Sequence, residues 1–447
     1  MHTTDLSAQT TWHNWAGQFS CSPRHVHRPQ DATALADALG RVRDAGGRAR
    51  IFGSGHSPSD VAMSDDHLIL LHAFDRVLHV DPDRRRVRAQ GNVRLDDLAR
   101  CLTMFGLALP NLGSIAEQTL AGAMATATHG TGLTYGVMPT WIRGTELMTA
   151  QGEREWIDED DPRLPGVSCS LGALGVHLAF ELEVAPAFDL AVEEGPVALD
   201  VAMERLEDRL QEDHYRLWLF PHCHQSWEWR ASRLPPGPGA RPSLTWRDRL
   251  TAWGRERLIG YYLFEALLRV GVGAPALVPA INRWYRRTLF SSARTSRGDA
   301  FDQFTFDCLF KQYVDEWAIP VAHTQAAIAA LLKTIAQNSY KVHLPIEVRF
   351  VAGDEIWMSP CYQQDSCYIG IIAYMPYGAT PEHEAYFADY EHIMTRFGGR
   401  PHWAKRFGLQ AADLAPRYPR WADFQALRDT LDPERRFANA YTDRVLG

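Results

Sequence analysis

Apolar and polar residues along the first 186 positions follow two periods, one typical of helices and one typical of strands. Residues 31–47 place apolar side chains at helical spacing and end in the pair Gly46–Gly47, which predicts a helix that stops there. The helical spacing returns at residues 94–106. Strands are predicted at residues 48–55, 67–74, 76–91 and 175–186, with Asp81-Pro82-Asp83 as a hairpin turn. Because helices and strands do not alternate regularly, this part is predicted to be an α+β domain rather than an array of βαβ units.

The rest of the chain has a similar mixture of patterns. Residues 196–300 are richer in Trp, Arg and Pro, and a Pro-Gly-rich loop is predicted at residues 233–242. From residue 301 onward, strand-like segments at 343–352 and 366–377 accompany a helical segment at 322–337. No internal repeat is present, and the length of 447 residues fits two or three domains.

One apolar stretch, residues 258–282, resembles a membrane span in length. It contains Glu265 and Arg269, each of which costs roughly 2.5–3.5 kcal/mol at a bilayer centre. Pro275 and Pro279 would also interrupt a spanning helix. We therefore expect a buried or interfacial helix, with contact to a membrane surface as the alternative.

Composition narrows the class of protein. The 447 residues carry a net charge of −8, which disfavours a nucleic-acid-binding protein. The 7 cysteines lack CxxC spacing and indicate reduced thiols. The N-terminus has neither the basic nor the apolar region of a signal peptide, so we expect a cytoplasmic protein.

Two loops rich in Gly, Ser and Thr are the strongest chemical signal. The first is GSGHS at residues 53–57, directly after a predicted strand, and the second spans residues 111–132. Glycine lets a ligand approach the backbone closely, which suits a pyrophosphate. Neither loop has the GxGxxG or P-loop pattern, so a Rossmann or Walker site is disfavoured, and ordinary turn glycines are the alternative. A neutral His56 among glycines would be an accessible nucleophile, although a lone histidine is more often structural.

A second group of candidates lies near the C-terminus. Alternation in residues 343–352 puts Glu347 and Arg349 on one face of a strand whose other residues indicate burial, although an ordinary surface ion pair would give the same pattern. Lys405 lies in PHWAK, which by itself predicts the start of a helix after Pro401. His222, Cys223 and His224 suggest a metal site, but adjacent residues of an extended segment point to opposite faces, so we expect no metal.

The two loops resemble the flavin-binding segments of the vanillyl-alcohol-oxidase-type flavoproteins, in the branch of sugar-1,4-lactone and alditol oxidases. The resemblance continues through residues 306–320, 345–350, 359–369, 397–407 and 431–441. It implies a two-subdomain α+β FAD-binding domain at 1–186, an α+β substrate-binding cap domain at 187–395, and a segment at 396–447 that returns to the flavin site. It also implies FAD joined covalently to His56. The cofactor-binding residues implied are Phe52, Gly53, Ser54, Gly55, His56, Ser57, Gly113, Ser114, Glu117, Thr119, Gly122, Thr126, Thr128, His129, Gly130, Gly132, Gly175, Val176, Asn439 and Tyr441.

The same resemblance implies that Glu347, Arg349 and Lys405 line the cavity over the flavin ring. Glu347 or Lys405 would accept the proton of the substrate hydroxyl, and Arg349 would stabilise negative charge on the reduced ring. Gly113 would leave room for molecular oxygen. The implied reaction is oxidation of an aldono-1,4-lactone. The first candidate substrate is L-gulono-1,4-lactone, oxidised at C2 to give L-ascorbate while O2 is reduced to H2O2. A D-arabinono-lactone or alditol oxidase, a lactone dehydrogenase with another electron acceptor, and a non-catalytic binding protein are the alternatives.

Overall fold

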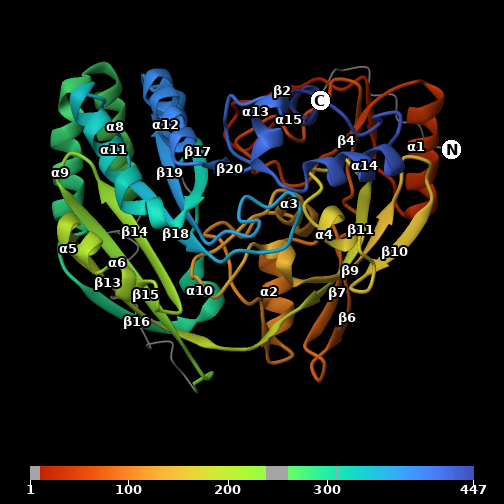
Figure 1. The fold of residues 1–447 in the computed structure, drawn as a ribbon, viewed down its shortest axis with the longest axis horizontal. Helices are drawn as coiled ribbons and strands as arrows, with labels where there is room; N and C mark the ends of the chain where they lie inside the picture. The colour runs from red at the N-terminus through yellow and green to blue at the C-terminus, as the bar shows by residue number, and fades with distance from the viewer. Residues whose placement is uncertain (1–10, 238–259, 309) are drawn as a thin grey trace.

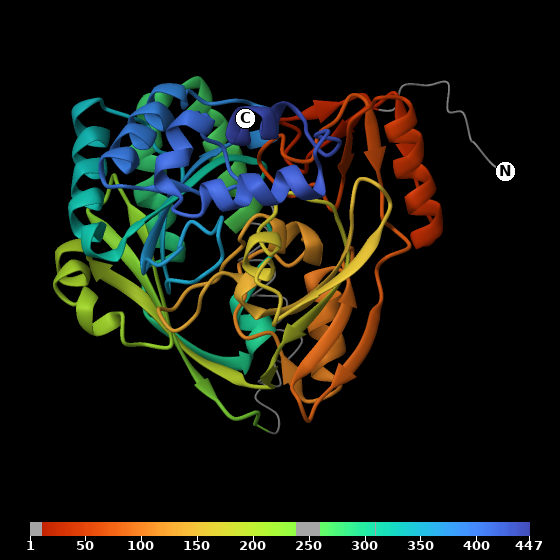
Figure 2. The ribbon, with the colours of Figure 1, turned by 45° about the vertical axis from the view of Figure 1, so that its right-hand side comes forward.

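The computed structural model describes residues 11–237, 260–308 and 310–447. Two halves lie side by side, one built on a large antiparallel sheet and one on two smaller sheets (Figure 1). The last helices of the chain lie on the half that contains the N-terminal strands (Figures 1 and 2). One hydrophobic core joins the halves, because it includes Val87 and Phe180 of the five-stranded sheet together with Leu217 and Ile369 of the large sheet.

A small parallel sheet opens the fold. Its order is β3 (His25–His27), β5 (His67–Ile69) and β4 (Ala49–Ile51). Helix α1 (Ala32–Asp44) packs Leu35, Leu39 and Val42 into the core shared with this sheet. The helix begins where Asp31 accepts a hydrogen bond from the Ala34 N–H and ends before Gly46, whose φ is +64°. The predicted helix at residues 31–47 is therefore confirmed.

A five-stranded antiparallel sheet follows. Its strands, in spatial order, are β10 (Arg154–Asp158), β9 (Ile142–Met148), β11 (Val176–Glu183), β7 (Arg86–Gln90) and β6 (Val77–Asp81). Strands β6 and β7 form a hairpin around the predicted Asp-Pro-Asp turn. The short helices of this half are α2 (Leu95–Thr103), α3 (Leu120–Ala125) and α4 (Leu164–Val167). Two small strand pairs complete it: β1 (Trp12–His13) with β2 (Ser20–Cys21), and β8 (Leu107–Ala108) with β12 (Ala185–Pro186).

The other half is organised by an eight-stranded antiparallel sheet. In spatial order its strands are β16 (Arg294–Asp299), β13 (Asp189–Ala198), β15 (Gln225–Leu234), β14 (His214–Phe220), β18 (Ile346–Val351), β19 (Ser366–Tyr374), β17 (Gln312–Pro320) and β20 (Arg400–Pro401). Its helices are α5 (Leu199–Glu204), α6 (Leu206–Arg209), α8 (Phe264–Gly273), α9 (Val278–Leu289), α10 (Ala300–Phe304), α11 (Thr324–Gln337) and α12 (Glu384–Arg396). The predicted strands at 343–352 and 366–377 and the helix at 322–337 are confirmed.

The C-terminal segment crosses back to the first half. After β20, helices α13 (Ala411–Leu414), α14 (Trp421–Leu431) and α15 (Ala440–Leu446) end the chain. The Ala49 N–H donates to the Arg436 carbonyl at 2.7 Å, which ties this segment to β4. The helix predicted after Pro401 is wrong: the Lys405 N–H closes a turn on the His402 carbonyl. Its physical reason is that the His402 N–H continues the pairing with β17 by donating to the Glu316 carbonyl.

The long apolar stretch forms a helix pair rather than a single span. Its described part, from residue 260, runs through α8 and a turn at Pro275–Leu277 into α9, and residues 258 and 259 lie outside the described residues. None of the helices in the described ranges combines the length and the apolar character that a membrane span requires.

Candidate active site

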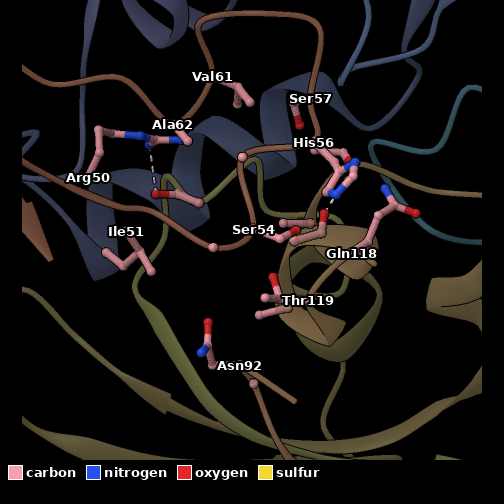
Figure 3. A pocket seen from close by; sticks show the side chains of 18 of the residues that line it. Arg50, Ile51, Ser54, His56, Ser57, Val61, Ala62, Asn92, Gln118 and Thr119 are labelled. Carbon is pink, nitrogen blue, oxygen red and sulfur yellow. Dashed lines mark hydrogen bonds between the residues drawn. The ribbon is translucent and has the colours of Figure 1, made fainter. Parts of the chain in front are cut away.

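Two cavities meet at the predicted histidine. The first lies between β4 of the parallel sheet and β11 of the five-stranded sheet, and the GSGHS loop forms one of its walls. The second, of about 390 Å³, lies against the large sheet. His56, Ser57 and Gln118 line both. In Figure 3, His56 and Gln118 lie together at one end of the view, away from Arg50.

The first cavity has the features that a dinucleotide needs. Arg50 is buried in its wall and donates to three carbonyl oxygens, those of Leu171, Gly172 and Phe437. Because its hydrogen-bond partners are carbonyls rather than a carboxylate, its positive charge is available to an anionic ligand. The hydroxyl of Ser59, also in the wall, is buried without a hydrogen-bond partner among the described residues. A pyrophosphate would satisfy both groups, so the cavity fits FAD.

Glycines bring the walls of this cavity together. A Cβ at Gly53 would lie 2.5 Å from Thr119 Oγ1, and one at Gly122 would lie 2.9 Å from the same atom. The two predicted loops therefore pack directly against each other. Gly55 has a φ of +69°, which only glycine adopts easily, and turns the chain so that His56 enters the cavities.

His56 is held as a neutral ring. Burial lowers its pKa below the ordinary value, and the charge of Glu117 opposes this shift only in part. Its imidazole stacks on Trp15, with ring centroids 5.8 Å apart and planes inclined by 17°. A neutral, oriented imidazole keeps one nitrogen lone pair for bonding, which is the form that a nucleophile requires.

The second cavity contains a network built across two neighbouring strands. In the register of β14 and β18, Arg216 lies opposite Arg349 and Trp218 lies opposite Glu347. Arg349 donates to Glu347 Oε1 at 2.7 Å and to Ser114 Oγ at 2.8 Å. The Trp218 indole donates to Glu347 Oε1 at 3.2 Å. This network holds the Glu347 carboxylate in one orientation at the cavity wall.

The charges in this network keep Glu347 ionised. Burial alone would raise its pKa, but the positive charges of Arg349 and Arg216 lower it overall. Burial lowers the pKa of Arg216 to about 10, which leaves it cationic at neutral pH. The Nε atoms of Arg216 and Arg349 are buried without hydrogen-bond partners in the described chain. Two cations face one carboxylate, so the wall favours an additional negative charge or a carbonyl oxygen.

Lys405 belongs to a second charged group on the same wall. Its Nζ lies 3.8 Å from Glu316 Oε2, and His129 Nε2 lies 3.6 Å from Glu316 Oε1. Burial opposes ionisation of Glu316, yet its interactions with His129 and Lys405 hold its pKa well below the usual range. Burial lowers the pKa of His402 to about 3, so that ring is neutral.

His129, Glu316 and His402 are the one trio of candidate metal ligands among the described residues, and a metal does not suit them. The Ala404 N–H donates to His402 Nδ1 at 3.1 Å, which places the proton of the neutral ring on Nε2. That nitrogen then carries a hydrogen and has no lone pair for an ion. The trio is better explained as a polar wall for an organic ligand.

Fourteen of the implied cofactor-binding residues line a cavity. The first cavity is lined by Gly53, Ser54, Gly55, His56, Ser57, Thr119, Gly122, Thr126, Gly175 and Val176, and the second by His56, Ser57, Gly113, Ser114, Thr128 and His129. Glu347, Arg349 and Lys405 also line the second. Outside both linings lie Phe52, Glu117, Gly130, Gly132, Asn439 and Tyr441.

Most of the residues outside the linings position the loops that form the walls. The Asn439 amide donates to the carbonyls of Asp60, Val61 and Met63, which belong to a wall segment of the first cavity. The Tyr441 hydroxyl donates to the Trp403 carbonyl at 2.6 Å, beside His402 and Lys405.

Phe52 and the two glycines act through packing. A Cβ at Gly55 would lie 2.8 Å from the Phe52 ring, and one at Gly130 would lie 2.2 Å from Asn111 Oδ1. The Gly132 N–H donates to the Phe350 carbonyl of β18 at 2.7 Å. Phe52, Gly130 and Gly132 therefore each lie where two segments of the chain pack closely together.

Sequence reasoning missed Arg50, Arg216, Trp218 and Glu316. The alternation in RLWLF, residues 216–220, puts Arg216 and Trp218 on one face of a strand, and this signal could have indicated these two residues.

Comparisons with known proteins identify the family. The profile of the D-arabinono-1,4-lactone oxidase family matches residues 180–445, and that of an FAD-binding domain matches residues 23–158. The chain belongs to the D-arabinono-1,4-lactone oxidase family. It is thus an FAD-dependent oxidoreductase, which confirms the family and the class of enzyme that the resemblance implied.

Three relatives are similar to this chain over nearly its whole length. L-gulonolactone oxidase of Scyliorhinus torazame is 37% identical over 97% of each chain. L-gulono-1,4-lactone dehydrogenase of Mycobacterium tuberculosis is 34% identical, over 98% of this chain and 99% of the relative. Alditol oxidase of a Streptomyces species is 33% identical, over 97% of this chain and 98% of the relative.

The solved structure of cholesterol oxidase from B. sterolicum has the same fold as this family member. The TM-score is 0.78 at 14% identity, over 98% of this chain and 97% of that one. The predicted fold class, an α+β FAD-binding domain with an α+β cap, is confirmed.

Proposed function

We propose that the protein oxidises an aldono-1,4-lactone, foremost L-gulono-1,4-lactone at C2, and that the 2-keto product tautomerises to L-ascorbate. The observation that carries this proposal is the ionised Glu347 carboxylate, held by Arg349 and Trp218 in the cavity that His56 also lines. Oxidation of a secondary alcohol removes a hydroxyl proton together with a hydride, and a fixed carboxylate is a suitable acceptor for that proton.

Each charged residue has a role in this reaction. When bound, FAD supplies the two-electron acceptor for the hydride from C2. Glu347 takes the proton of the C2 hydroxyl through Oε2, because its Oε1 already accepts two hydrogen bonds. Lys405 donates to the same substrate oxygen and orients it. Arg349 and Arg216, which both donate to Ser114 Oγ, stabilise the negative charge of the reduced flavin ring.

The proposal includes a covalent bond between His56 and FAD. Support comes from the neutral ring of His56, its place on the border of both cavities and the glycines that leave it accessible. It also includes molecular oxygen as the electron acceptor, with H2O2 as the product. Gly113 lines the second cavity, and a residue without a side chain there leaves space that oxygen could use.

The proposed location is the cytoplasm, and we also propose peripheral contact with a membrane surface. Tyr262, Leu263, Val270 and Leu277, on and beside α8, are between 43% and 53% exposed. Flotation with anionic lipid vesicles tests this contact. Wild-type protein should rise with the vesicles, and the double variant Leu263→Asp/Val270→Asp should stay behind. A wild-type protein that stays behind would overturn the proposed membrane contact.

One experiment tests the reaction. The FAD-loaded protein is mixed anaerobically with L-gulono-1,4-lactone, D-arabinono-1,4-lactone or xylitol, and the loss of oxidised-flavin absorbance is followed. Oxygen is then admitted and H2O2 is measured. We expect the gulonolactone to reduce the flavin fastest and peroxide to form with it in equal amount. Reduction by xylitol alone would make the protein an alditol oxidase, and reduction without peroxide would make it a dehydrogenase.

A further inference from the structure

Gly370 lies in the middle of β19, where a glycine weakens a strand and the fold gives no reason for it. A Cβ built there would meet Glu316 Cγ at 3.7 Å, an ordinary van der Waals contact. Its φ is not among the positive values that favour glycine. Gly370 does line the second cavity. A glycine inside a strand that packing does not require often marks the close approach of a ligand.

Two carboxylates flank this glycine on the same face of the sheet. In the register of β18 and β19, Glu347 is the partner of Gly370, and in that of β17 and β19 its partner is Glu316. Neighbouring strands are about 4.7–4.9 Å apart, so the backbones of the two glutamates are roughly 9–10 Å apart. The backbone of Gly370 forms the floor between them.

The two carboxylates differ in what they bind. Glu347 Oε1 accepts hydrogen bonds from Arg349 and Trp218. The nearest side-chain nitrogens to the Glu316 carboxylate are His129 Nε2 and Lys405 Nζ, at 3.6 and 3.8 Å, which is beyond ordinary hydrogen-bond distance. Glu316 is buried and ionised, and it therefore has acceptor capacity that a ligand would satisfy.

We propose that Gly370 and Glu316 form the subsite for the exocyclic hydroxyls of the sugar lactone. This inference rests on the proposed function. The reacting C2 hydroxyl lies at Glu347, the lactone ring lies flat over the Gly370 backbone, and the exocyclic hydroxyls donate to Glu316. The subsite then favours a six-carbon lactone, with two exocyclic hydroxyls, over a five-carbon lactone, with one, because the shorter substrate leaves the Glu316 carboxylate partly unsatisfied.

The test measures kcat and KM of the FAD-loaded enzyme for L-gulono-1,4-lactone and D-arabinono-1,4-lactone. In Gly370→Ala the added methyl group occupies the floor, so KM for both lactones should rise about tenfold while the unfolding midpoint is unchanged or higher. Gly298→Ala, in edge strand β16 of the same sheet, is the matched control, since Gly298 lies outside the cavity lining. It should leave both constants unchanged.

Glu316→Gln separates a hydroxyl-binding role from one that only positions Lys405. We expect kcat/KM to fall about tenfold for the six-carbon lactone and less than threefold for the five-carbon lactone. Equal losses on both lactones, or a Gly370→Ala enzyme with unchanged KM, would overturn the subsite and leave the proposed function intact. A wild-type flavin that neither lactone reduces would overturn both.

Discussion

Trp218 and Glu347 lie opposite each other on β14 and β18, and the indole N–H donates to Glu347 Oε1 at 3.2 Å. Arg349, two residues further along β18, donates to the same oxygen at 2.7 Å. Both donors use Oε1, so Oε2 is available to the substrate. One cross-strand pair and one same-strand pair thus orient the proposed base without involving a loop, which suits a group that must hold its position during proton transfer.

Replacing Trp218 by Phe should slow turnover without loss of cofactor. The ring remains while the hydrogen bond to a charged group, typically about 1.5–3 kcal/mol, is removed, so we expect kcat to fall about tenfold or more. Steady-state kinetics with flavin content as a reference measures this. Trp227→Phe is the control, because its indole also donates to a glutamate, Glu194, yet Trp227 is outside the cavity lining. Similar losses in both variants would argue against a role for the Trp218 bond in catalysis.

Glu347→Gln and Arg349→Ala should each lower turnover by orders of magnitude while FAD stays bound. The first removes the proton acceptor, a contribution of about 10²–10⁴-fold, and the second removes both a partner of Glu347 and a charge beside the flavin. Single-turnover flavin reduction measures the chemical step directly. Near-normal reduction in both variants would rule out this active site.

Arg216 acts together with Arg349 to lower the pKa of Glu347. Its positive charge contributes to a Glu347 pKa below the ordinary 4.5, so wild-type kcat/KM should show no acidic limb from Glu347 near neutrality. Arg216→Met removes the charge and keeps most of the side-chain volume. A carboxylate that loses a nearby cation has a raised pKa, so the acidic limb should move to higher pH. A pH profile of kcat/KM checks this, and a limb that stays in place would mean that Arg349 alone sets the pKa.

Local patterns in the sequence predicted several elements, whereas the resemblance to a known family implied the overall fold and the flavin-binding residues. The helix at α1, the hairpin of β6 and β7 and the GSGHS loop each depend on neighbouring residues. The side chains that line the second cavity from the large sheet come together only through pairing between strands that are distant in the sequence. Trp218 is 129 residues from Glu347, and no pattern in either strand indicates that they pair. Glu316 was missed for a similar reason, since only the pairing with β19 shows that this residue, rather than Asp315, faces the cavity.

His56→Ala should leave FAD dissociable. If the proposed bond exists, acid precipitation of the wild-type protein leaves yellow colour in the pellet, whereas the variant releases it to the supernatant. The variant should still bind FAD reversibly, because Arg50 and the glycine loops remain. Flavin that stays in the pellet with His56→Ala would assign the bond to another residue, and dissociable flavin in the wild-type protein would make His56 a non-covalent contact.

Asn439 should stabilise the first cavity through two separable interactions. Its side-chain oxygen accepts from the Thr442 N–H at the start of α15, and its amide donates to the carbonyls of Asp60, Val61 and Met63. Asn439→Ala loses both, which should lower the free energy of unfolding by about 2–4 kcal/mol.

Asn439→Ser distinguishes the two contributions. Serine still caps the helix but lacks the amide donors, so it should recover about half of the stability. Both variants lose the bonds to the Asp60–Met63 segment, so both should bind FAD more weakly than the wild type. Urea unfolding of the FAD-free protein measures the first quantity, and FAD titration measures the second. If serine restored FAD binding fully, the cap on α15 would matter to the cavity and the bonds to the Asp60–Met63 segment would not.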